Sequence, residues 1–177
     1  MQVYFIDNEE YFKRKSILHD ENDVFFPDND ERALFFCRGV LETVRKLGWK
    51  PDIIHCHGWM TAFVPLYVKH LFNDDPHFED AKLVFTAYDD PAENLNKDMA
   101  KKLTQEGFPK DLLKSLAKPT TEDLSKFAMG LCDAVTKGDP KLSRVMENAF
   151  KATDGRVLGY TSEEERVAAH AEFYHDI

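Results

Sequence analysis

Residues 49–61 read Trp49-Lys50-Pro51-Asp52-Ile53-Ile54-His55-Cys56-His57-Gly58-Trp59-Met60-Thr61 and contain a turn, an apolar run and the start of a second apolar segment. The run 52–56 has the length and composition of a buried strand. Gly58 interrupts it, and helical spacing follows over 60–72, with Pro65 in the first turns, where proline is tolerated. The stretch predicts a strand that leads directly into a helix, the repeating unit of a parallel sheet.

The same alternation of strands and helices extends outward from this unit. Upstream, Asp28, Asn29 and Asp30 are suitable N-cap residues, and apolar side chains then recur at helical spacing until Gly48. The other predicted strands cover 3–6, 82–86, 134–136 and 156–158, and the other predicted helices cover 28–48, 95–105, 110–117, 121–132, 140–150 and a segment capped by Thr161 or Ser162. This order predicts an α/β fold with an open parallel sheet flanked by helices.

Composition limits the classes of function. The chain has 177 residues, 43% of them hydrophobic, which is enough to close a core, and a net charge of −9 disfavours nucleic acid and anionic membranes as partners. It contains no apolar run of membrane-spanning length, and its three cysteines do not form a disulfide framework, so we expect a cytoplasmic protein. Without a linker or repeat, residues 1–177 are expected to form one domain.

Candidate binding residues follow the strands, because ligands of open parallel sheets bind beyond the carboxyl ends of the strands. Three segments have this position: 7–10 with Asp7 and Asn8, 57–61, and 87–90 with Tyr88 and Asp89. The glycines have neither dinucleotide-binding nor P-loop spacing, so no self-contained nucleotide site is predicted.

The segment His55-Cys56-His57 admits several interpretations. A zinc site would need further ligands, and none has recognisable spacing, so no metal is expected. We expect His55 to be a buried structural residue with locally satisfied ring nitrogens. For His57 a functional and a structural role are equally open, and Cys56 is expected to be an inert core thiol.

Three stretches of the chain resemble a known family. They are Tyr4-Phe5-Ile6-Asp7-Asn8-Glu9-Glu10-Tyr11-Phe12, then Asp28-Asn29-Asp30-Glu31-Arg32-Ala33-Leu34-Phe35-Phe36-Cys37-Arg38, and then 49–62 followed by Pro65-Leu66-Tyr67. In order and spacing they resemble the N-terminal domain of bacterial glycogen synthases and plant starch synthases, and residues 124–136 resemble it more weakly. The chain looks most like the short, single-domain members of this family.

The resemblance implies one half of a two-domain glycosyltransferase. A Rossmann-like acceptor-side domain would bind an α-1,4-glucan and face a second domain that contacts ADP-glucose, and glucose would be transferred with retention, without a metal or other cofactor. The family's Lys-x-Gly-Gly-Leu loop would precede Met1 and its second domain would follow Ile177. We therefore expect an incomplete domain that lacks its first strand or strands, with Met1 as an internal methionine.

The chain departs from the family pattern at the expected site. Gly58 stands where the family has Asp, and Met60 stands where it has the catalytic His. At the next strand the family has a Thr-x-His-Asn segment, whereas here Thr86 is followed by Ala87, Tyr88 and Asp89. A thioether cannot donate the hydrogen bonds that an imidazole provides. No catalytic residue is therefore assigned, and the binding candidates are His57, Gly58, Trp59, Thr61, Asp7, Asn8, Tyr88 and Asp89.

These observations support two main hypotheses. The first is a glycogen/starch synthase-like glucosyltransferase domain that is weak or inactive as an isolated chain. The alternative is a noncatalytic glucan-binding or protein-interaction module on the same fold, whose simplest form is a vestigial cleft in a protein that only assembles with others. Expected partners are an α-glucan acceptor and ADP-glucose, with self-association or a partner chain, and neither nucleic acid nor membrane.

Overall fold

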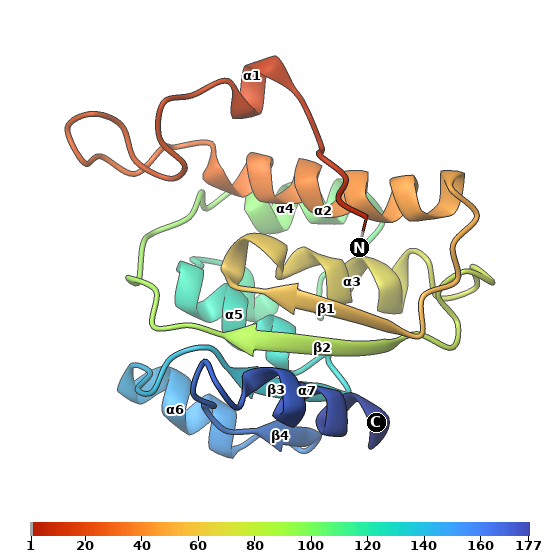
Figure 1. Ribbon diagram of the computed structural model, residues 1–177. Coiled ribbons are helices and arrows are strands. Elements are labelled where there is room, and N and C mark those ends of the chain that lie inside the picture. The colour runs from red at the N-terminus through yellow and green to blue at the C-terminus, as the bar shows by residue number, and fades with distance from the viewer. Residues whose placement is uncertain (1) are drawn as a thin grey trace.

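The computed structural model describes residues 2–177 and contains an open sheet of four parallel strands (Figure 1). The strands are β1(Ile53–His57), β2(Lys82–Ala87), β3(Ala134–Lys137) and β4(Arg156–Leu158), and they pair in the order β1-β2-β3-β4. Each predicted strand from residue 52 onward is present, which confirms the α/β fold with an open parallel sheet. The register pairs His57 with Thr86 and Thr86 with Thr136, so the carboxyl ends of β1, β2 and β3 lie at one edge.

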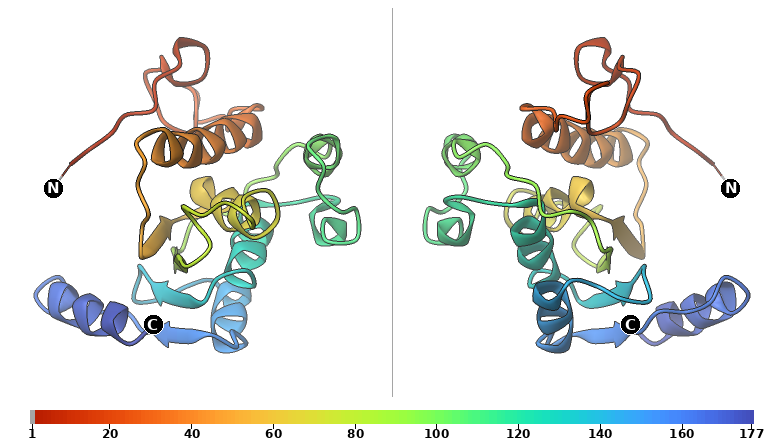
Figure 2. Two further views of the ribbon diagram at one scale, coloured as in Figure 1. Left: turned by 90° about the vertical axis from the view of Figure 1, so that its right-hand side faces the viewer. Right: turned by 90° about the vertical axis from the view of Figure 1, so that its left-hand side faces the viewer.

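Helices cover the two faces of the sheet unequally. Figure 2 shows α3, α5 and α6 on one face and α7 on the other. Because each crossover leads to the next strand in the same direction with the same hand, the connecting helices fall on one side. The helices are α1(Glu9–Phe12), α2(Asn29–Lys46), α3(Phe63–His70), α4(Met99–Gln105), α5(Thr121–Met129), α6(Arg144–Lys151) and α7(Arg166–His175), with 3₁₀ turns η1(Trp59–Thr61) and η2(Lys114–Leu116).

Alternating side chains along the strands divide the core in two. Leu83 and Phe85 of β2 belong to the large cluster that α2, α3 and α5 complete. Val84, between them, belongs to a small cluster with Ala134 and Phe173 of α7. Alternation of this kind follows from the two-residue period of a strand. One face of the sheet therefore carries most of the buried apolar surface.

Capping residues explain where several helices begin. The side chain of Thr120 accepts from the backbone N–H of Asp123, whose carboxylate accepts from the backbone N–H of Thr120, and this capping box starts α5. Ser143 caps α6 in the same way through the N–H of Met146. α6 therefore begins after its predicted start at residue 140. α4 also begins late, because Leu95 donates its N–H to the carbonyl of Pro119 instead of entering a helix.

The predicted strand at 3–6 is wrong. Val3 and Phe5 are 61% and 88% exposed, and this segment belongs to none of the described strands. Ile6 lies against Gly39 and Tyr4 packs edge-on against Trp49 at 5.2 Å between ring centroids. An apolar segment becomes a strand only where a neighbouring strand supplies backbone hydrogen bonds. Among the described strands β1 pairs with β2 alone, and residues 3–6 do not pair with the opposite edge of β1.

The predicted helix at 110–117 is also wrong, because only the 3₁₀ turn η2 forms there. Leu113 and Leu116 are both buried, and a spacing of three residues places them on one side of a 3₁₀ turn. The terminal helix α7 begins at Arg166, later than its predicted cap. Ser162 instead accepts from the N–H of Glu165 in the preceding turn. Within residues 2–177, no helix has both the length and the apolar character needed to cross a bilayer.

Candidate functional site

A cleft of about 270 Å³ lies at the carboxyl ends of β1 and β2. Its floor comes from the segment that follows β1 and from Tyr88 and Asp90, which follow β2, and its outer wall comes from the loop before α2. The residues that line it are Ile17, Leu18, His57, Gly58, Trp59, Met60, Tyr88 and Asp90. The cleft therefore has the position that the sequence predicts for a ligand site.

His57 and Tyr88 form the polar centre of the cleft. The Nδ1 atom of His57 and the hydroxyl of Tyr88 lie 3.0 Å apart and share a hydrogen bond. Tyr88 stands directly over Gly138, where an added Cβ would lie 2.2 Å from Cε1 of the tyrosine ring. The position of Tyr88 therefore requires glycine at residue 138. Desolvation, followed by the nearby His170, lowers the pKa of His57, so its ring is neutral at physiological pH.

His55 is the structural histidine that the sequence predicts. Its Nδ1 lies 2.5 Å from the hydroxyl of Tyr174 in α7, and its Nε2 lies 2.6 Å from Oγ1 of Thr86. Burial, together with His57 and His170, lowers the pKa of His55 to about 3. Both ring nitrogens are engaged inside the protein, so His55 supports the ring of His57, which lies 4.2 Å away between centroids.

Cys56 lies on the opposite face of β1 from these histidines. It is buried in the large core, and burial raises the pKa of its thiol to about 12. A thiol that stays protonated is a poor nucleophile. This agrees with the expectation of an inert core residue.

The turn after β1 is held by its own hydrogen bonds. Gly58 has φ of 70°, a conformation that favours glycine, and its N–H donates to the carbonyl of Thr86. Thr61 donates its hydroxyl to the Gly58 carbonyl at 2.9 Å. The ring of Trp59, 3% exposed, packs against Phe25 at 5.9 Å. These candidates shape the cleft, and of the four residues 57, 58, 59 and 61 only His57 presents an exposed polar side chain to it.

Two acidic residues follow Tyr88, and of these only Asp90 lines the cleft. Asp89 is exposed and donates its backbone N–H to the carboxylate of Asp139. Asp90 lines the cleft, and desolvation, then Asp139 and Asp89, raise the pKa of its carboxyl group. A Cβ placed on Gly58 would lie 3.7 Å from Oδ2 of Asp90. Asp90 thus lies in the segment 87–90 that the sequence places at the site, although only Tyr88 and Asp89 of that segment are among the predicted binding residues.

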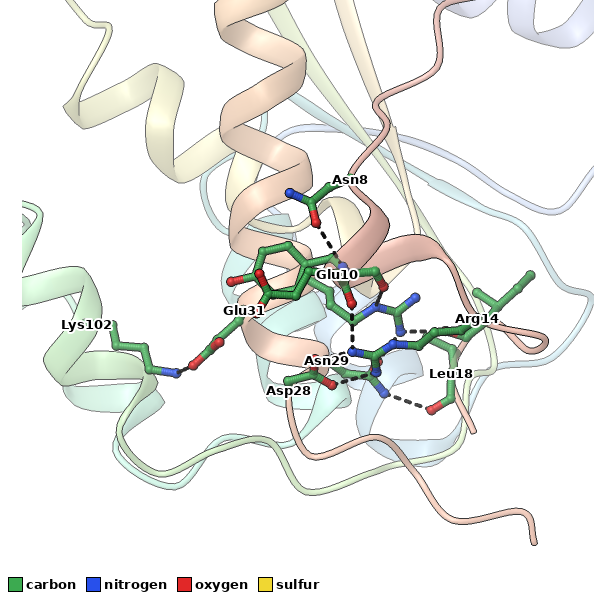
Figure 3. Close-up of polar contacts among 11 residues, drawn as sticks. Asn8, Glu10, Arg14, Leu18, Asp28, Asn29, Glu31 and Lys102 are labelled. Carbon is green, nitrogen blue, oxygen red and sulfur yellow. Dashed lines mark hydrogen bonds and ion pairs between the residues drawn. The ribbon is translucent and has the colours of Figure 1, made fainter. Parts of the chain in front are cut away.

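Asp7 and Asn8 lie outside the cleft. Asn8 caps α1 by accepting from the N–H of Tyr11 at 2.9 Å (Figure 3), and Asp7 is exposed. The segment that reaches the cleft from this part of the chain is Ile17-Leu18. No motif in the sequence marks these two residues.

A larger hollow of about 370 Å³ lies between α1, α2, α3 and α4. Its cations are already paired, since Lys102 contacts Glu31 and Asp30 and Arg38 contacts Glu106. We therefore take the cleft at the strand ends as the candidate site. Across residues 2–177, His, Cys, Asp and Glu side chains form no group of three that could hold a metal ion.

Comparison with known proteins identifies what the chain resembles. Residues 1–155 match the family described as the starch synthase catalytic domain. Glycogen synthase of Chlorobium limicola is 45% identical over 89 residues, and glycogen synthase 2 of Geobacter sulfurreducens is 40% identical over 86 residues. These matches cover 50% and 49% of this chain but 18% of each relative, so the chain corresponds to a small part of their length.

A solved structure has the same fold. The catalytic domain of starch synthase IV from Arabidopsis thaliana, bound to ADP and acarbose, superposes with a TM-score of 0.66 at 21% identity. The match covers 87% of this chain and 32% of that chain.

Proposed function

The chain belongs to the starch synthase catalytic domain family, and from this premise we propose that its strand-end cleft binds the end of an α-1,4-glucan. In this proposal residues 1–177 act as one acceptor-side domain without an internal boundary. The solved relative is bound to ADP and to acarbose, an analogue of an α-glucan, which supports a carbohydrate ligand for this fold.

The lining of the cleft carries the proposal. His57, Tyr88 and Asp90 offer hydrogen-bond donors and acceptors that suit sugar hydroxyls, and Ile17, Leu18 and Met60 offer apolar surface for the faces of pyranose rings. Among the described residues, no lysine or arginine lines the cleft. An uncharged glucan needs none, whereas a nucleotide diphosphate is usually held by cations or exposed backbone N–H groups.

We further propose that the isolated chain transfers glucose from ADP-glucose weakly or not at all. Met60 occupies the position of the family's catalytic histidine and supplies neither a proton nor a hydrogen-bond donor. Efficient transfer requires donor, acceptor and charge-stabilising groups to be held together, and the cleft offers groups only for the acceptor. Glucan binding without turnover is the expected behaviour.

Calorimetry with maltoheptaose tests the binding. We expect the wild-type chain to bind, and we expect His57→Ala to weaken binding by about tenfold through loss of a hydrogen-bonding group. His70→Ala is the matched control, because His70 is exposed at the end of α3 and does not line the cleft. No heat of binding in the wild-type chain, or equal losses in both variants, would contradict the proposal.

Incorporation of labelled glucose from ADP-glucose into glycogen tests the transfer. Turnover by the purified chain that His57→Ala abolishes would establish an active synthase and would overturn the noncatalytic part of the proposal. Binding of maltoheptaose without incorporation would support it.

A further inference from the structure

The outer wall of the cleft is built from a loop with little regular structure. Between α1 and α2 an isolated antiparallel bridge joins His19 and Phe25, with backbone hydrogen bonds from the N–H of Asp20 to Val24 and from the N–H of Phe26 to Leu18, and the rest consists of turns and bends. Ile17 and Leu18 of this loop line the cleft, and Ile17 is 76% exposed. Among the described backbone hydrogen bonds none reaches the carbonyl of Ile17, so this part of the wall depends on side-chain contacts.

A buried arginine in the first turn of α2 supplies those contacts. Arg32 is 3% exposed, and its guanidinium group donates to the backbone carbonyls of Tyr11 at 2.9 Å and Ile17 at 2.6 Å. It also donates to the side-chain oxygen of Asn29. Its carbon Cζ lies 5.6 Å from the ring centroids of Phe12 and of Phe26.

Asn29 holds the next residue of the loop. Its side-chain nitrogen donates to the carbonyl of Leu18 at 2.9 Å, a contact that Figure 3 shows as a dashed line. Asn29 is fully buried, and its amide oxygen accepts from Arg32. Two linked side chains of one helical turn thus contact the consecutive carbonyls of Ile17 and Leu18, and the Leu18 carbonyl also accepts from the backbone N–H of Phe26 at 3.0 Å.

A second contact fastens the loop just before this wall. The guanidinium group of Arg14 donates to both carboxylate oxygens of Asp28, at 2.8 and 2.5 Å (Figure 3). Its carbon Cζ also lies 4.6 Å from the centroid of the Phe26 ring. This pairing lowers the pKa of Asp28 and keeps its carboxylate charged. Arg32, by contrast, makes its described hydrogen bonds to neutral oxygens.

A buried arginine at position 32 lowers stability unless the planar geometry of its guanidinium group is needed. Burying a charge without an ion-pair partner is unfavourable, and an apolar side chain would fill the same space more cheaply. A guanidinium group, however, carries five donors in a fixed plane and can bind the Tyr11 and Ile17 carbonyls simultaneously. A lysine has one nitrogen and cannot reproduce that arrangement.

We propose that Arg32 is a positioning residue of the glucan cleft. Together with Asn29, it fixes the Ile17-Leu18 wall over His57 and Trp59. The inference rests on the proposed function for the identity of the ligand. According to this inference, Arg32 is essential for the affinity of the cleft for glucan, although the Arg32 side chain does not line the cleft.

The test combines a binding measurement with a local probe of the loop. Lys13, Arg14 and Lys15 are trypsin sites on this loop, and their cleavage rate reports how firmly it is held. For Arg32→Lys we expect about tenfold weaker maltoheptaose binding and about tenfold faster cleavage at 13–15, from loss of charged hydrogen bonds. Cleavage at Arg45, in the last turn of α2, should stay unchanged.

Arg38→Lys is the matched control. It makes the same chemical change on the same helix, at a side chain that pairs with Glu106 and contacts neither Ile17 nor Leu18 by any described hydrogen bond. We expect it to leave both affinity and loop cleavage unchanged. Asn29→Asp provides a second variant should Arg32→Lys fold poorly, because it removes the donor to Leu18 and keeps an acceptor for Arg32.

The outcomes separate the two proposals. Unchanged affinity in Arg32→Lys and Asn29→Asp, with a wild-type chain that binds, would overturn the inference. A general rise in cleavage that includes Arg45 would also overturn it, because Arg32 would then be an ordinary core residue. If the wild-type chain does not bind maltoheptaose, the proposed function fails, and cleavage at 13–15 still decides whether Arg32 holds the loop.

Discussion

The half-buried imidazole of His55 should make the stability of the protein fall as the pH drops below about 6.5. In the folded chain its pKa is about 3, whereas an unfolded histidine titrates near 6.5. Between these values the unfolded state binds the extra proton. The contribution of His55 is therefore fully present above the unfolded pKa and is lost progressively as the pH falls toward 3.

The magnitude follows from these two pKa values. From about pH 7 to about pH 5, unfolded His55 passes from mostly neutral to almost fully protonated, while folded His55 stays neutral, so stability should fall by at most about 2 kcal/mol from this residue, and by less because solvent screens the half-buried ring. The hydrogen bonds to Tyr174 and Thr86 hold the ring in its buried position over this range.

Urea unfolding at both pH values, followed by tryptophan fluorescence, measures the effect. His55→Asn is the comparison, because its amide still offers a donor and an acceptor but does not titrate. The variant should be less stable at both pH values, and on acidification it should lose less stability than the wild type, by up to about 2 kcal/mol. Equal losses in the two proteins would refute the assignment of a neutral, buried His55.

Two further predictions concern a glycine packed against Tyr88 and two buried thiols. Gly138→Ala should destabilise the chain by about 1–3 kcal/mol and displace Tyr88 from His57, since the added Cβ overlaps the tyrosine ring. In Gly159→Ala the added Cβ meets nothing within 4 Å, so urea unfolding should be unchanged. Equal destabilisation by Gly138→Ala and Gly159→Ala would contradict this account. Burial raises the pKa of Cys37, and that of Cys56 to about 12, so both thiols should react with Ellman's reagent about a hundredfold faster in urea than in the native chain. Fast labelling of either thiol before unfolding would show that the core opens.

The sequence predicts a strand correctly only where the residues that determine its pairing lie in the segment or next to it. The runs at 52–56 and 82–86 are bounded by turns and connected by the apolar helix α3, so their pairing follows from the order of elements. The segment 3–6 has the same composition, but a strand also needs a partner, and composition does not supply one. The helix predicted at 110–117 failed for a related reason, since burial of Leu113 and Leu116 is satisfied by a single 3₁₀ turn.

The candidate site could be predicted only in part. His57 and Tyr88 follow neighbouring strands, and the register of β1 and β2 brings them together, as the sequence analysis expects. The Ile17-Leu18 wall has no such signal, because Arg32 and Asn29 bind backbone carbonyls, which are the same for every residue type. The contact between His55 and Tyr174 joins residues 119 positions apart, and no local pattern indicates it.

The order β1-β2-β3-β4 also has a consequence for how the chain folds. Each strand pairs with the next one along the sequence, so the sheet can grow by addition at one edge, and each addition closes only one loop. The longest of these loops joins β2 to β3 and contains α4 and α5. We therefore expect docking of β3 on β2 to be the slowest step in assembling the sheet, because non-local pairing must overcome the largest loop entropy before it gains contacts.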